Sequence, residues 1–420
     1  MRIMKTVYLK RGKEESLLRF HPWVFSGAIH HADDGIAEGE IVRVVAADGR
    51  YLATGHYQQG SIAVRVLTFT DEAIDSQFWL RRLAQALKAR EAIGLAPSAA
   101  NVPSTPLQTN AYRLVHGEGD MLPGLIIDVY GRTAVMQAHS IGMHLARHQI
   151  AQQLLAAMHG QIVNIYYKSD TTLPFIEPEN GYLAGGHDQN IAIENGLRFH
   201  VDWEQGQKTG FFVDQRENRS LLEKYARDRR VLNMFCYTGG FSFYAMRGGA
   251  RLVHSVDSSA KAIDLTRRNV ELNFPGDPRH EAFCEDAFQF LNSQISNLNS
   301  QLSTPKSQTS NLKSQPPYDL IILDPPAFAK HRTALHNALK GYIRLNNKAF
   351  EKIASGGILF TFSCSQVVSK DHFRNAVFTA AAQAHRTVRI LHQLHQPADH
   401  PINLYHPEGE YLKGLVLFVE

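Results

Sequence analysis

The stretch Val231–Ala250, VLNMFCYTGGFSFYAMRGGA, constrains the fold of this chain more than any other. It starts with a short apolar run that predicts a strand, turns at two adjacent glycines, and continues as a helix rich in aromatic and small residues. A second apolar run, Val253–Asp257, follows it and ends in an acid. This order of strand, glycine turn, helix and acidic strand end predicts the first half of a doubly wound nucleotide-binding sheet.

The turn indicates which kind of nucleotide would fit. It contains Gly239 and Gly240 but no GxGxxG pattern, whose backbone amides would cradle a pyrophosphate. A looser turn suits a nucleoside without phosphates, which favours S-adenosylmethionine (SAM) over NAD. Asp257 could then accept hydrogen bonds from ribose hydroxyls. On these residues alone, an ordinary strand, turn and helix with a surface aspartate remains the alternative.

Length and composition limit the class of protein. The 420 residues predict two or three domains, and 44% hydrophobic content is enough for a full core. Three cysteines in no paired or metal-like spacing predict neither disulfides nor a metal site, and they fit the reducing cytoplasm. We find no signal peptide and no membrane span, so no membrane partner is expected. A net charge of +4 is compatible with nucleic acid.

Patterning divides the chain into three segments and an insertion. Residues 1–71 predict a small all-β domain, with a hairpin around Asp48-Gly49. Residues 72–188 begin with a helix and continue as an α+β unit, and residues 189–420 alternate strand and helix. The tract 293–317, rich in Ser, Gln, Asn and Leu, predicts a low-complexity insertion without a catalytic role.

Two later strand ends carry further reactive groups. Tyr318–Phe328, YDLIILDPPAF, predicts a buried strand that ends in Asp324, after which two prolines stiffen the exit. In FTFSCSQ, Cys364 follows another strand, and Asp286 follows a third. Since parallel strands end at one edge of a sheet, we expect these groups to converge with Asp257 there. Cys236 and Cys284 lie within or beside apolar runs and are interpreted as packing residues.

A further segment lies just ahead of the nucleotide-binding pattern. GQKTGFFVDQRENR combines glycines, aromatics and charges, and Asp214 is available to cap the helix that follows. We interpret Phe212, Asp214 and Arg216 as a wall of the cofactor pocket, with a plain helix lead-in as the alternative.

The motifs GQKTGFFVDQRENR, LNMFCYTGGFS, SVDSS, DLIILDPPAF and FSCSQ, in this order, resemble those of class I SAM-dependent RNA methyltransferases. The resemblance is strongest to the bacterial 23S ribosomal RNA cytosine-C5 methyltransferase family, and it covers nearly the whole chain. It implies a PUA-like RNA-binding domain over 1–71, a central α+β domain that positions RNA over 72–188, and a Rossmann-like methyltransferase domain over 189–420. The tract 293–317 departs from the family pattern.

The resemblance also implies roles for individual residues. Asp257 would hold the ribose, Asp286 the adenine amine, and the turn the methionine part of SAM. The full implied cofactor set is Phe212, Asp214, Arg216, Phe235, Tyr237, Thr238, Gly239, Gly240, Asp257, Asp286 and Asp324. The implied contacts to large-subunit ribosomal RNA are Lys5, Lys10, Arg11, Lys13, Pro325, Pro326 and Phe328. A solvated basic face is the alternative for the four basic residues, and a homodimer is a further expectation.

The resemblance implies catalytic roles for Cys364 and Asp324 that the chemistry permits, and a buried packing residue is the alternative for Cys364. C5 of cytosine is a poor nucleophile, but a thiolate that adds to C6 makes C5 reactive towards the sulfonium methyl group. Cys364 is the predicted thiolate, and Asp324 would hydrogen-bond N3 or the exocyclic amine. The base that removes the C5 proton is not identified from the sequence. The DPP motif lacks a cysteine, which excludes a two-cysteine mechanism that uses that loop.

Three other functions compete with this prediction. A SAM-dependent RNA N-methyltransferase acting on guanine or adenine shares the DPP-type strand end and needs no cysteine. An NAD-dependent oxidoreductase is disfavoured by the missing GxGxxG pattern. A non-catalytic RNA-binding protein is disfavoured by the complete set of acidic strand ends.

Overall fold

The computed structural model describes residues 4–97, 108–173, 176, 178–292, 318–329 and 331–420, so the insertion predicted at 293–317 lies outside the described residues. The chain divides into two compact units. Unit 1 comprises Met1–Asp214 and Pro397–Gly409, and unit 2 comprises Gln215–Gln396 and Glu410–Glu420. Within the described ranges, none of the helices combines the length and apolar character needed to cross a bilayer.

Unit 1 begins with a six-stranded sheet in the order β2-β6-β5-β4-β1-β3. Its strands are β1 (Thr6–Leu9), β2 (Trp23–Phe25), β3 (Ile29–Ala32), β4 (Ile41–Val45), β5 (Tyr51–Tyr57) and β6 (Ile62–Thr68), with the short helix α1 (Glu15–Leu18) between β1 and β2. The predicted hairpin joins β4 to β5, and Gly49 takes the left-handed backbone (φ 84°) that its turn requires. Alternate apolar residues of these strands, such as Val42, Val44 and Val64, form the core of the sheet.

A second sheet of unit 1 has the order β11-β10-β9-β8-β7. Its strands are β7 (Ala111–His116), β8 (Leu125–Tyr130), β9 (Thr133–Ala138), β10 (Asn164–Tyr167) and β11 (Gly181–Ala184), and its helices are α2 (Ser76–Ala92), α3 (Ile141–Leu145) and α4 (Arg147–Ala157). Buried residues of α2 and α4, including Trp79 and Leu154, share one core with the strands. A hairpin with Asn195-Gly196 at its turn joins β12 (Ile191–Glu194) to β13 (Leu197–His200).

A buried arginine attaches the late segment 397–409 to unit 1. The Arg90 guanidinium is 1% exposed and donates to both carboxylate oxygens of Asp120, at 2.5 and 2.8 Å. It also donates to the Asp399 carbonyl (2.8 Å), while the Asp399 carboxylate accepts from the Arg113 backbone N–H (2.9 Å). Bidentate charge-assisted bonds of this kind fix geometry as well as energy. They explain why residues far along the chain belong to unit 1.

The prediction that Asp214 caps a helix is wrong. Asp214 lies within a 3-10 turn, Val213–Gln215, that leads directly into α5 (Arg216–Tyr225). Gln215 occupies the N-cap position, and no side chain caps it. The extra turn moves the start of α5 beyond the residue that the sequence pattern selects.

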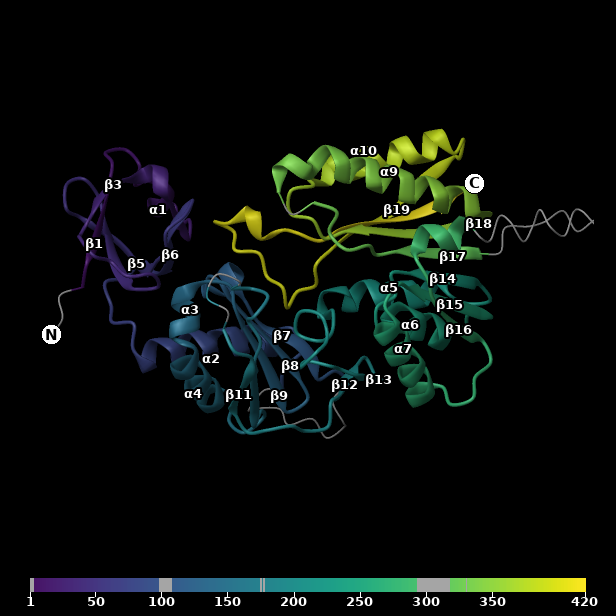
Figure 1. Cartoon of the computed structure of the whole chain (residues 1–420), viewed down its shortest axis with the longest axis horizontal. Coiled ribbons are helices and arrows are strands. Elements are labelled where there is room, and N and C mark those ends of the chain that lie inside the picture. The colour runs from purple at the N-terminus through teal and green to yellow at the C-terminus, as the bar shows by residue number, and fades with distance from the viewer. Residues whose placement is uncertain (1–3, 98–107, 174–175, 177, 293–317, 330) are drawn as a thin grey trace, which may run out of the picture. The chain divides into compact units, whose positions relative to one another are not determined.

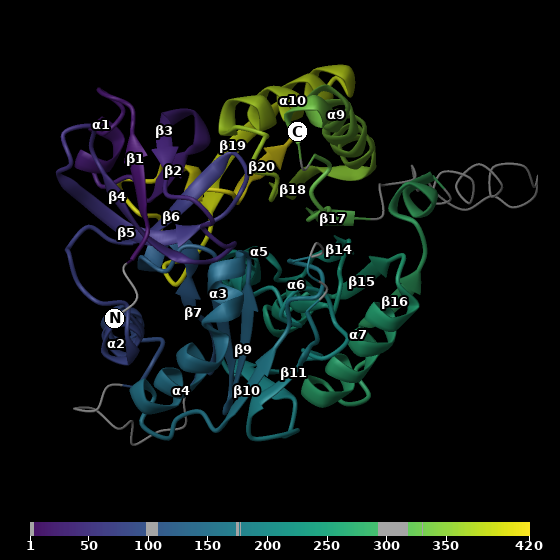
Figure 2. The ribbon, with the colours of Figure 1, turned by 60° about the vertical axis from the view of Figure 1, so that its left-hand side comes forward.

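Unit 2 is a seven-stranded sheet between two layers of helices. Its strands are β14 (Arg230–Met234), β15 (Leu252–Asp257), β16 (His280–Cys284), β17 (Tyr318–Leu323), β18 (Ile353–Ser363), β19 (Val388–His395) and β20 (Lys413–Val419). Its other helices are α6 (Gly240–Arg247), α7 (Ala260–Asn273), α9 (Leu335–Lys352) and α10 (Lys370–Gln383). Helices α9 and α10 cover one face, and α5, α6 and α7 cover the other, as both views show (Figure 1 and Figure 2).

The strand order β16-β15-β14-β17-β18-β20-β19 determines where a ligand can bind. Strands β14 to β18 are mutually parallel, and β20 inserts antiparallel beside β18. The order reverses between β14 and β17, and ligands of doubly wound sheets bind outside the carboxyl ends of the strands at this switch point. The predicted Rossmann-like fold is therefore confirmed.

A chain of buried polar groups crosses the first half of this sheet. The Asn233 amide donates to Ser242 Oγ (2.9 Å), which lies 2.6 Å from Ser255 Oγ. Ser255 Oγ in turn lies 2.8 Å from Nε2 of His280. Burial lowers the pKa of His280 to about 4, so the ring is neutral at pH 7. The chain satisfies polar groups that would otherwise be costly inside the sheet.

Unit 2 should lose stability as the pH falls from 6.5 towards 4. In this window the unfolded state protonates His280 and the folded state does not, so protons favour unfolding. At pH 5 the loss attributable to His280 is at most about 2 kcal/mol. We expect denaturant unfolding of His280→Gln to show a smaller loss between pH 7 and pH 5 than the wild type.

His336→Gln provides the matched control, because His336 is exposed on α9 and should leave the pH dependence unchanged. An identical pH dependence in His280→Gln and wild type would contradict the assignment.

Candidate functional site

Five groups of unit 2 meet at the carboxyl edge of the parallel sheet. Phe235, Asp257 and Asp324 end or directly follow β14, β15 and β17, while Asp286 and Cys364 follow β16 and β18. Neighbouring strands lie about 4.8 Å apart, so the edge from β16 to β18 spans about 19 Å. The structure thus brings together the strand ends that the sequence singles out, with the two glycines near the middle of the row.

The turn after β14 has an unusual backbone. Phe235 (φ 58°), Tyr237 (φ 47°) and Gly239 (φ 85°) alternate in the left-handed region, which non-glycine residues rarely adopt. Helix α7 supports the turn through two hydrogen bonds. Thr266 Oγ1 donates to the Tyr237 carbonyl (2.9 Å), and the Asn269 amide donates to the Thr238 carbonyl (3.3 Å). Strained backbone held by its surroundings is typical of binding sites. The sequence analysis missed Thr266 and Asn269.

Three N–H groups of the turn are already used within the protein. Those of Cys236 and Gly239 donate to the carbonyls of Val256 (3.0 Å) and Cys236 (2.8 Å). The Tyr237 N–H donates to Asp257 Oδ2 (3.0 Å). A pyrophosphate needs several converging amides. Three of the turn's amides are not available for that role, which favours an uncharged part of a ligand here.

Asp257 and Asp286 are oriented by backbone amides and retain acceptor capacity. Asp257 Oδ1 accepts from the Ser259 N–H (2.9 Å), in addition to the Tyr237 bond to Oδ2. Asp286 Oδ1 accepts from the N–H groups of Phe288 (2.9 Å) and Gln289 (3.0 Å) at the start of the helical residues 287–292. A carboxylate oxygen has two lone pairs, so both groups can still accept from hydroxyl or amine donors.

The loops after β17 and β18 are tied together through Tyr342 of α9. Its hydroxyl accepts from Ser363 Oγ (2.9 Å) and is hydrogen-bonded to the backbone of Phe328. Ser365 Oγ donates to the Ala329 carbonyl (2.5 Å), which adds a second link between the loops. Burial raises the pKa of Tyr342 to about 12, so its hydroxyl is neutral at pH 7. The loops that carry Asp324 and Cys364 are therefore held as one piece.

Asp324 and Cys364 are both partly accessible within this arrangement. Asp324 Oδ2 accepts from the side-chain amide of Gln215 (3.1 Å), which Asn218 orients by donating to Gln215 Oε1 (2.6 Å). The prolines differ, since Pro325 is buried and Pro326 is exposed. The Phe328 ring is half-buried, 4.6 Å from the ring centre of Tyr342. Phe328 therefore helps to build the loop, and its predicted contact with RNA stays a prediction.

Sequence analysis also missed Lys413, the first residue of β20. Its side chain is 6% exposed, and Nζ donates to the carbonyls of Ser365 (2.5 Å) and Val368 (2.6 Å). Burial lowers the pKa of Lys413 to about 8. A lysine inside the otherwise apolar final strand, YLKGLVLFV, is the signal that could have identified it.

The predicted pocket wall is divided between the two units. Phe212 and Asp214 belong to unit 1, where Nζ of Lys208 lies 5.0 Å from the Phe212 ring centre. Arg216 begins α5 in unit 2 and is 4% exposed. Closure of the pocket by this segment stays a prediction.

The predicted RNA contacts of the first domain differ in their surroundings. Lys5 is paired with Glu40 (3.2 Å) and also bonds to the Gly35 carbonyl, so it is partly neutralised. Lys10 donates to the Gly27 carbonyl (2.9 Å) but is exposed, as are Arg11 and Lys13. Lys10, Arg11 and Lys13 are more exposed than Lys5, and so their side chains can reach a phosphate more easily.

The two other cysteines have different environments. Cys236 is 6% exposed, and burial raises the pKa of its thiol, as expected for a packing residue. Cys284 is exposed, so the packing role predicted for it is wrong. It ends β16, the edge strand of the sheet, where no further strand covers it.

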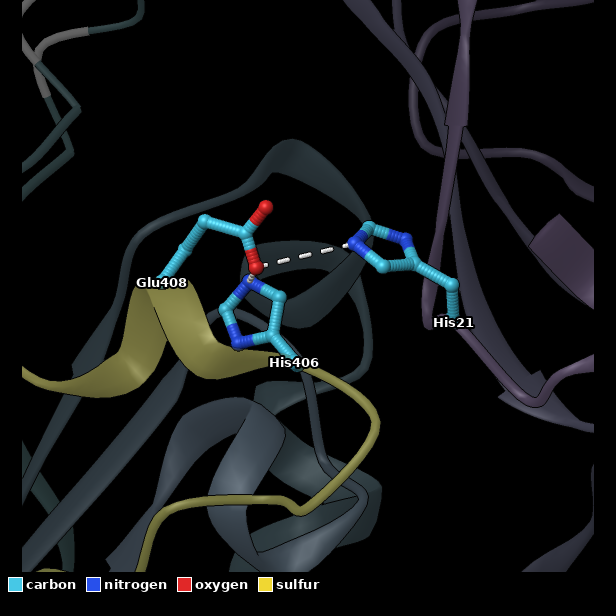
Figure 3. Close-up of side chains that lie close together, drawn as sticks. All are labelled: His21, His406 and Glu408. Atoms are coloured by element: carbon cyan, nitrogen blue, oxygen red, sulfur yellow. Dashed lines mark ion pairs between the residues drawn. The ribbon is translucent and has the colours of Figure 1, made fainter.

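One group of possible metal ligands occurs among the described residues: His21, His406 and Glu408 of unit 1 (Figure 3). Glu408 Oε2 lies 3.7 Å from His21 Nε2 and 3.8 Å from His406 Nε2. His21 Nδ1 lies 3.2 Å from the backbone nitrogen of Trp23 and 3.4 Å from its carbonyl oxygen, so it can accept from one or donate to the other. The distances to Glu408 describe a histidine–glutamate contact.

Comparison with known proteins agrees with this geometry. The family described as S-adenosylmethionine-dependent methyltransferase matches residues 162–404, and the family described as PUA-like domain matches residues 7–69. The fold is similar to that of a candidate methyltransferase solved in complex with SAH, with a TM-score of 0.81, 21% identity, and coverage of 99% of this chain and 100% of that one. A candidate SAM-dependent methyltransferase from Streptococcus mutans has a TM-score of 0.79 at 20% identity, with the same coverage.

Curated relatives match over almost the full length. The proteins named Ribosomal RNA large subunit methyltransferase I are 40% identical in Tolumonas auensis and 37% in Aeromonas salmonicida, with 98% of each chain covered. The Escherichia coli protein of this name is 36% identical, with 97% of each chain covered.

Fold, edge groups and family match define a SAM-dependent methyltransferase with a PUA-like domain. Within that class, the chain belongs to the family of the ribosomal RNA large subunit methyltransferase I proteins. Its residues fit SAM: Asp257 can hold ribose hydroxyls, Asp286 can accept from the adenine amine, and the internally bonded turn needs no phosphate. SAM is the cofactor, and it supplies the electrophilic methyl group.

Gly239→Ala should weaken SAM binding by at least about tenfold. A Cβ at this position would lie 2.5 Å from the Phe243 ring and 2.8 Å from the Thr266 methyl group, in addition to the strain of φ 85°. That strain alone costs about 1–2 kcal/mol. The turn would have to move away from Thr266, and isothermal titration with SAM measures the loss.

Gly249→Ala is the control for backbone strain. Gly249 has the same φ of 85°, but a Cβ there would meet nothing closer than 3.9 Å. It should lose stability yet bind SAM like the wild type. Equal SAM affinity in both variants would show that the shape of the turn is not required.

Proposed function

We propose that this protein transfers the methyl group of SAM to C5 of a cytosine in large-subunit ribosomal RNA. One observation carries the proposal: the partly exposed Cys364 follows β18, two strands from the β14 turn, in a loop tied to the one that carries Asp324. The names of the curated relatives supply the class of RNA. A donor bound at the β14 turn and a cytosine bonded to the thiol would then share one edge of the sheet, as methyl transfer from the donor to C5 requires.

Cys364 acts first in the proposed mechanism. Its thiolate forms a bond to C6 of the cytosine, and the C5–C6 π electrons move to C5 and into the ring. C5 then takes the methyl group, and the electron pair of the sulfonium–methyl bond stays on sulfur. Loss of the C5 proton to a base and breakage of the S–C6 bond restore the aromatic ring and the free cysteine.

Asp324 orients the base during these steps. Its carboxylate can accept a hydrogen bond from the exocyclic amine, and it can hold a proton at N3 while electron density from the thiolate addition moves into the ring. The bond from Gln215 to Oδ2 fixes the carboxylate, and the two prolines stiffen the chain that follows it.

The remaining segments would bring the RNA to this edge. We assign RNA binding to the PUA-like residues 1–71, with Lys10, Arg11 and Lys13 as phosphate contacts, and RNA positioning to residues 72–188. Residues 189–420 form the catalytic domain in this proposal, with Phe212, Asp214 and Arg216 closing the donor pocket. The substrate places the protein in the cytoplasm.

RNA that contains 5-fluorocytidine should trap the enzyme. Fluorine at C5 cannot leave as a cation, so the S–C6 bond persists after methyl transfer. Incubation with SAM and this RNA should give a denaturant-stable complex in the wild type and in Cys284→Ser. Cys364→Ala should give no complex and should lose at least about 10³-fold in methylation rate.

Cys284→Ser controls for loss of a thiol at the same edge, since Cys284 is exposed and ends β16. Full activity of Cys364→Ala, without any trapped complex in the wild type, would overturn the cytosine-C5 mechanism in favour of methylation at nitrogen. Mapping modified bases in ribosomal RNA from cells with and without the protein would then locate the true target.

A further inference from the structure

Lys413 is a buried cation attached to the segment that carries Cys364. In the antiparallel pairing of β18 and β20, Lys413 lies opposite Ser363, the residue before Cys364. Nζ donates to the carbonyls of Ser365 and Val368, which follow Cys364. The lysine thus contacts the chain on both sides of Cys364. Its backbone pairs with the residue before the cysteine, and its ammonium group binds two carbonyls after the cysteine.

The hydrogen bonds of Lys413 leave one donor unassigned. An ammonium group has three N–H donors, and the two carbonyl bonds account for two of them. Among the described residues, no carboxylate forms an ion pair with Lys413 within 4.0 Å, and Glu410 is paired with Lys370 (2.6 Å). A cation buried with carbonyls alone is costly unless an anion compensates it.

Cys364 is the group whose charge would compensate Lys413. The negative charge of a Cys364 thiolate raises the pKa of Lys413 against the opposing effect of burial. Electrostatic coupling is reciprocal, so a protonated Lys413 favours the thiolate to the same extent. The other charged groups that act on Lys413 are Glu410 and Lys370.

Tyr342 and Asp324 also belong to the electrostatic surroundings of the thiol. The charges of Cys364 and Asp324 both raise the pKa of Tyr342, which stays neutral. The negative charge of Asp324 opposes formation of a thiolate, whereas the positive charge of Lys413 favours it.

We propose that Lys413 is a positioning residue for Cys364: its ammonium stabilises the thiolate and fixes the direction in which the thiol points. The inference rests on the proposed covalent role of Cys364, which it extends by naming the group that activates the thiol. A nucleophilic cysteine typically needs a neighbouring cation of this kind.

Two variants distinguish a purely structural role of Lys413 from an electrostatic effect on Cys364. Lys413→Met keeps the length of the side chain and loses the charge, whereas Lys413→Arg keeps the charge. If Lys413 acts only through its two carbonyl bonds, the ionisation of Cys364 should not depend on its charge.

The test is the pH dependence of Cys364 alkylation by iodoacetamide in the full-length protein, without SAM or RNA, followed by peptide mass spectrometry. Only the thiolate reacts, so the midpoint of the rate profile reports thiol ionisation. In the wild type, the midpoint of Cys364 should lie below that of Cys284, which serves as an internal reference. In Lys413→Met the Cys364 midpoint should rise by about one pH unit, a tenfold lower rate near neutral pH. Lys413→Arg should restore most of the shift.

Two results would overturn the proposal. One is a Cys364 midpoint in the wild type at or above that of Cys284, a measurement that needs no variant to fold. The other is an unchanged Cys364 midpoint in folded Lys413→Met. Because alkylation requires neither RNA nor methyl transfer, a failure of 5-fluorocytidine trapping with a normal alkylation shift would refute the covalent mechanism and leave the activation of Cys364 by Lys413 standing.

Discussion

The parallel register of β16, β15, β14, β17 and β18 is the constraint on which the rest of unit 2 depends. Because all five strands run in one direction, residues at or just after their carboxyl ends come to the same edge. Carboxylates at the β15 and β16 ends suit the nucleoside of SAM, and in our proposal the thiol at the β18 end binds the acceptor base. The strained turn after β14 lies between these two groups in the strand order.

The antiparallel strand β20 adds a second constraint on the carboxyl edge of this sheet. It carries Lys413 from near the end of the chain to the segment after β18. Three connections converge there: Tyr342 and Ser365 tie the thiol loop to the Asp-Pro-Pro loop, and Lys413 ties it to β20. All three depend on buried polar groups, which are specific in geometry because an unmade bond is costly in the interior. The two loops are therefore held by buried hydrogen bonds to other parts of unit 2 rather than by their own sequence.

Unit 1 is connected in a different way from unit 2. Its sheets are joined by ordinary hairpins, and the buried bidentate pair of Arg90 and Asp120 attaches the late segment 397–409. The contact of His21 and His406 with Glu408 belongs to this unit as well. Some exposed basic side chains of this unit, such as Arg19 and Arg81, are paired with glutamates, whereas Lys10 and Arg11 are exposed and form no ion pair among the described residues. In our proposal, Lys10 and Arg11 contact RNA.

The sequence alone determined the elements and the order of their reactive ends, because a strand, a glycine turn and a terminal acid are local patterns. It placed Asp257, Asp324 and Cys364 at strand ends, and the parallel topology brings these strand ends to one edge of the sheet. It misplaced the start of α5 by proposing Asp214 as the cap, and it took Cys284 for a packing residue, although Cys284 is exposed at the end of the edge strand β16. Only the tertiary structure decided that Thr266, Tyr342 and Lys413 support the site, because their bonds join residues 21 or more positions apart in the chain through carbonyls and hydroxyls that no sequence pattern marks.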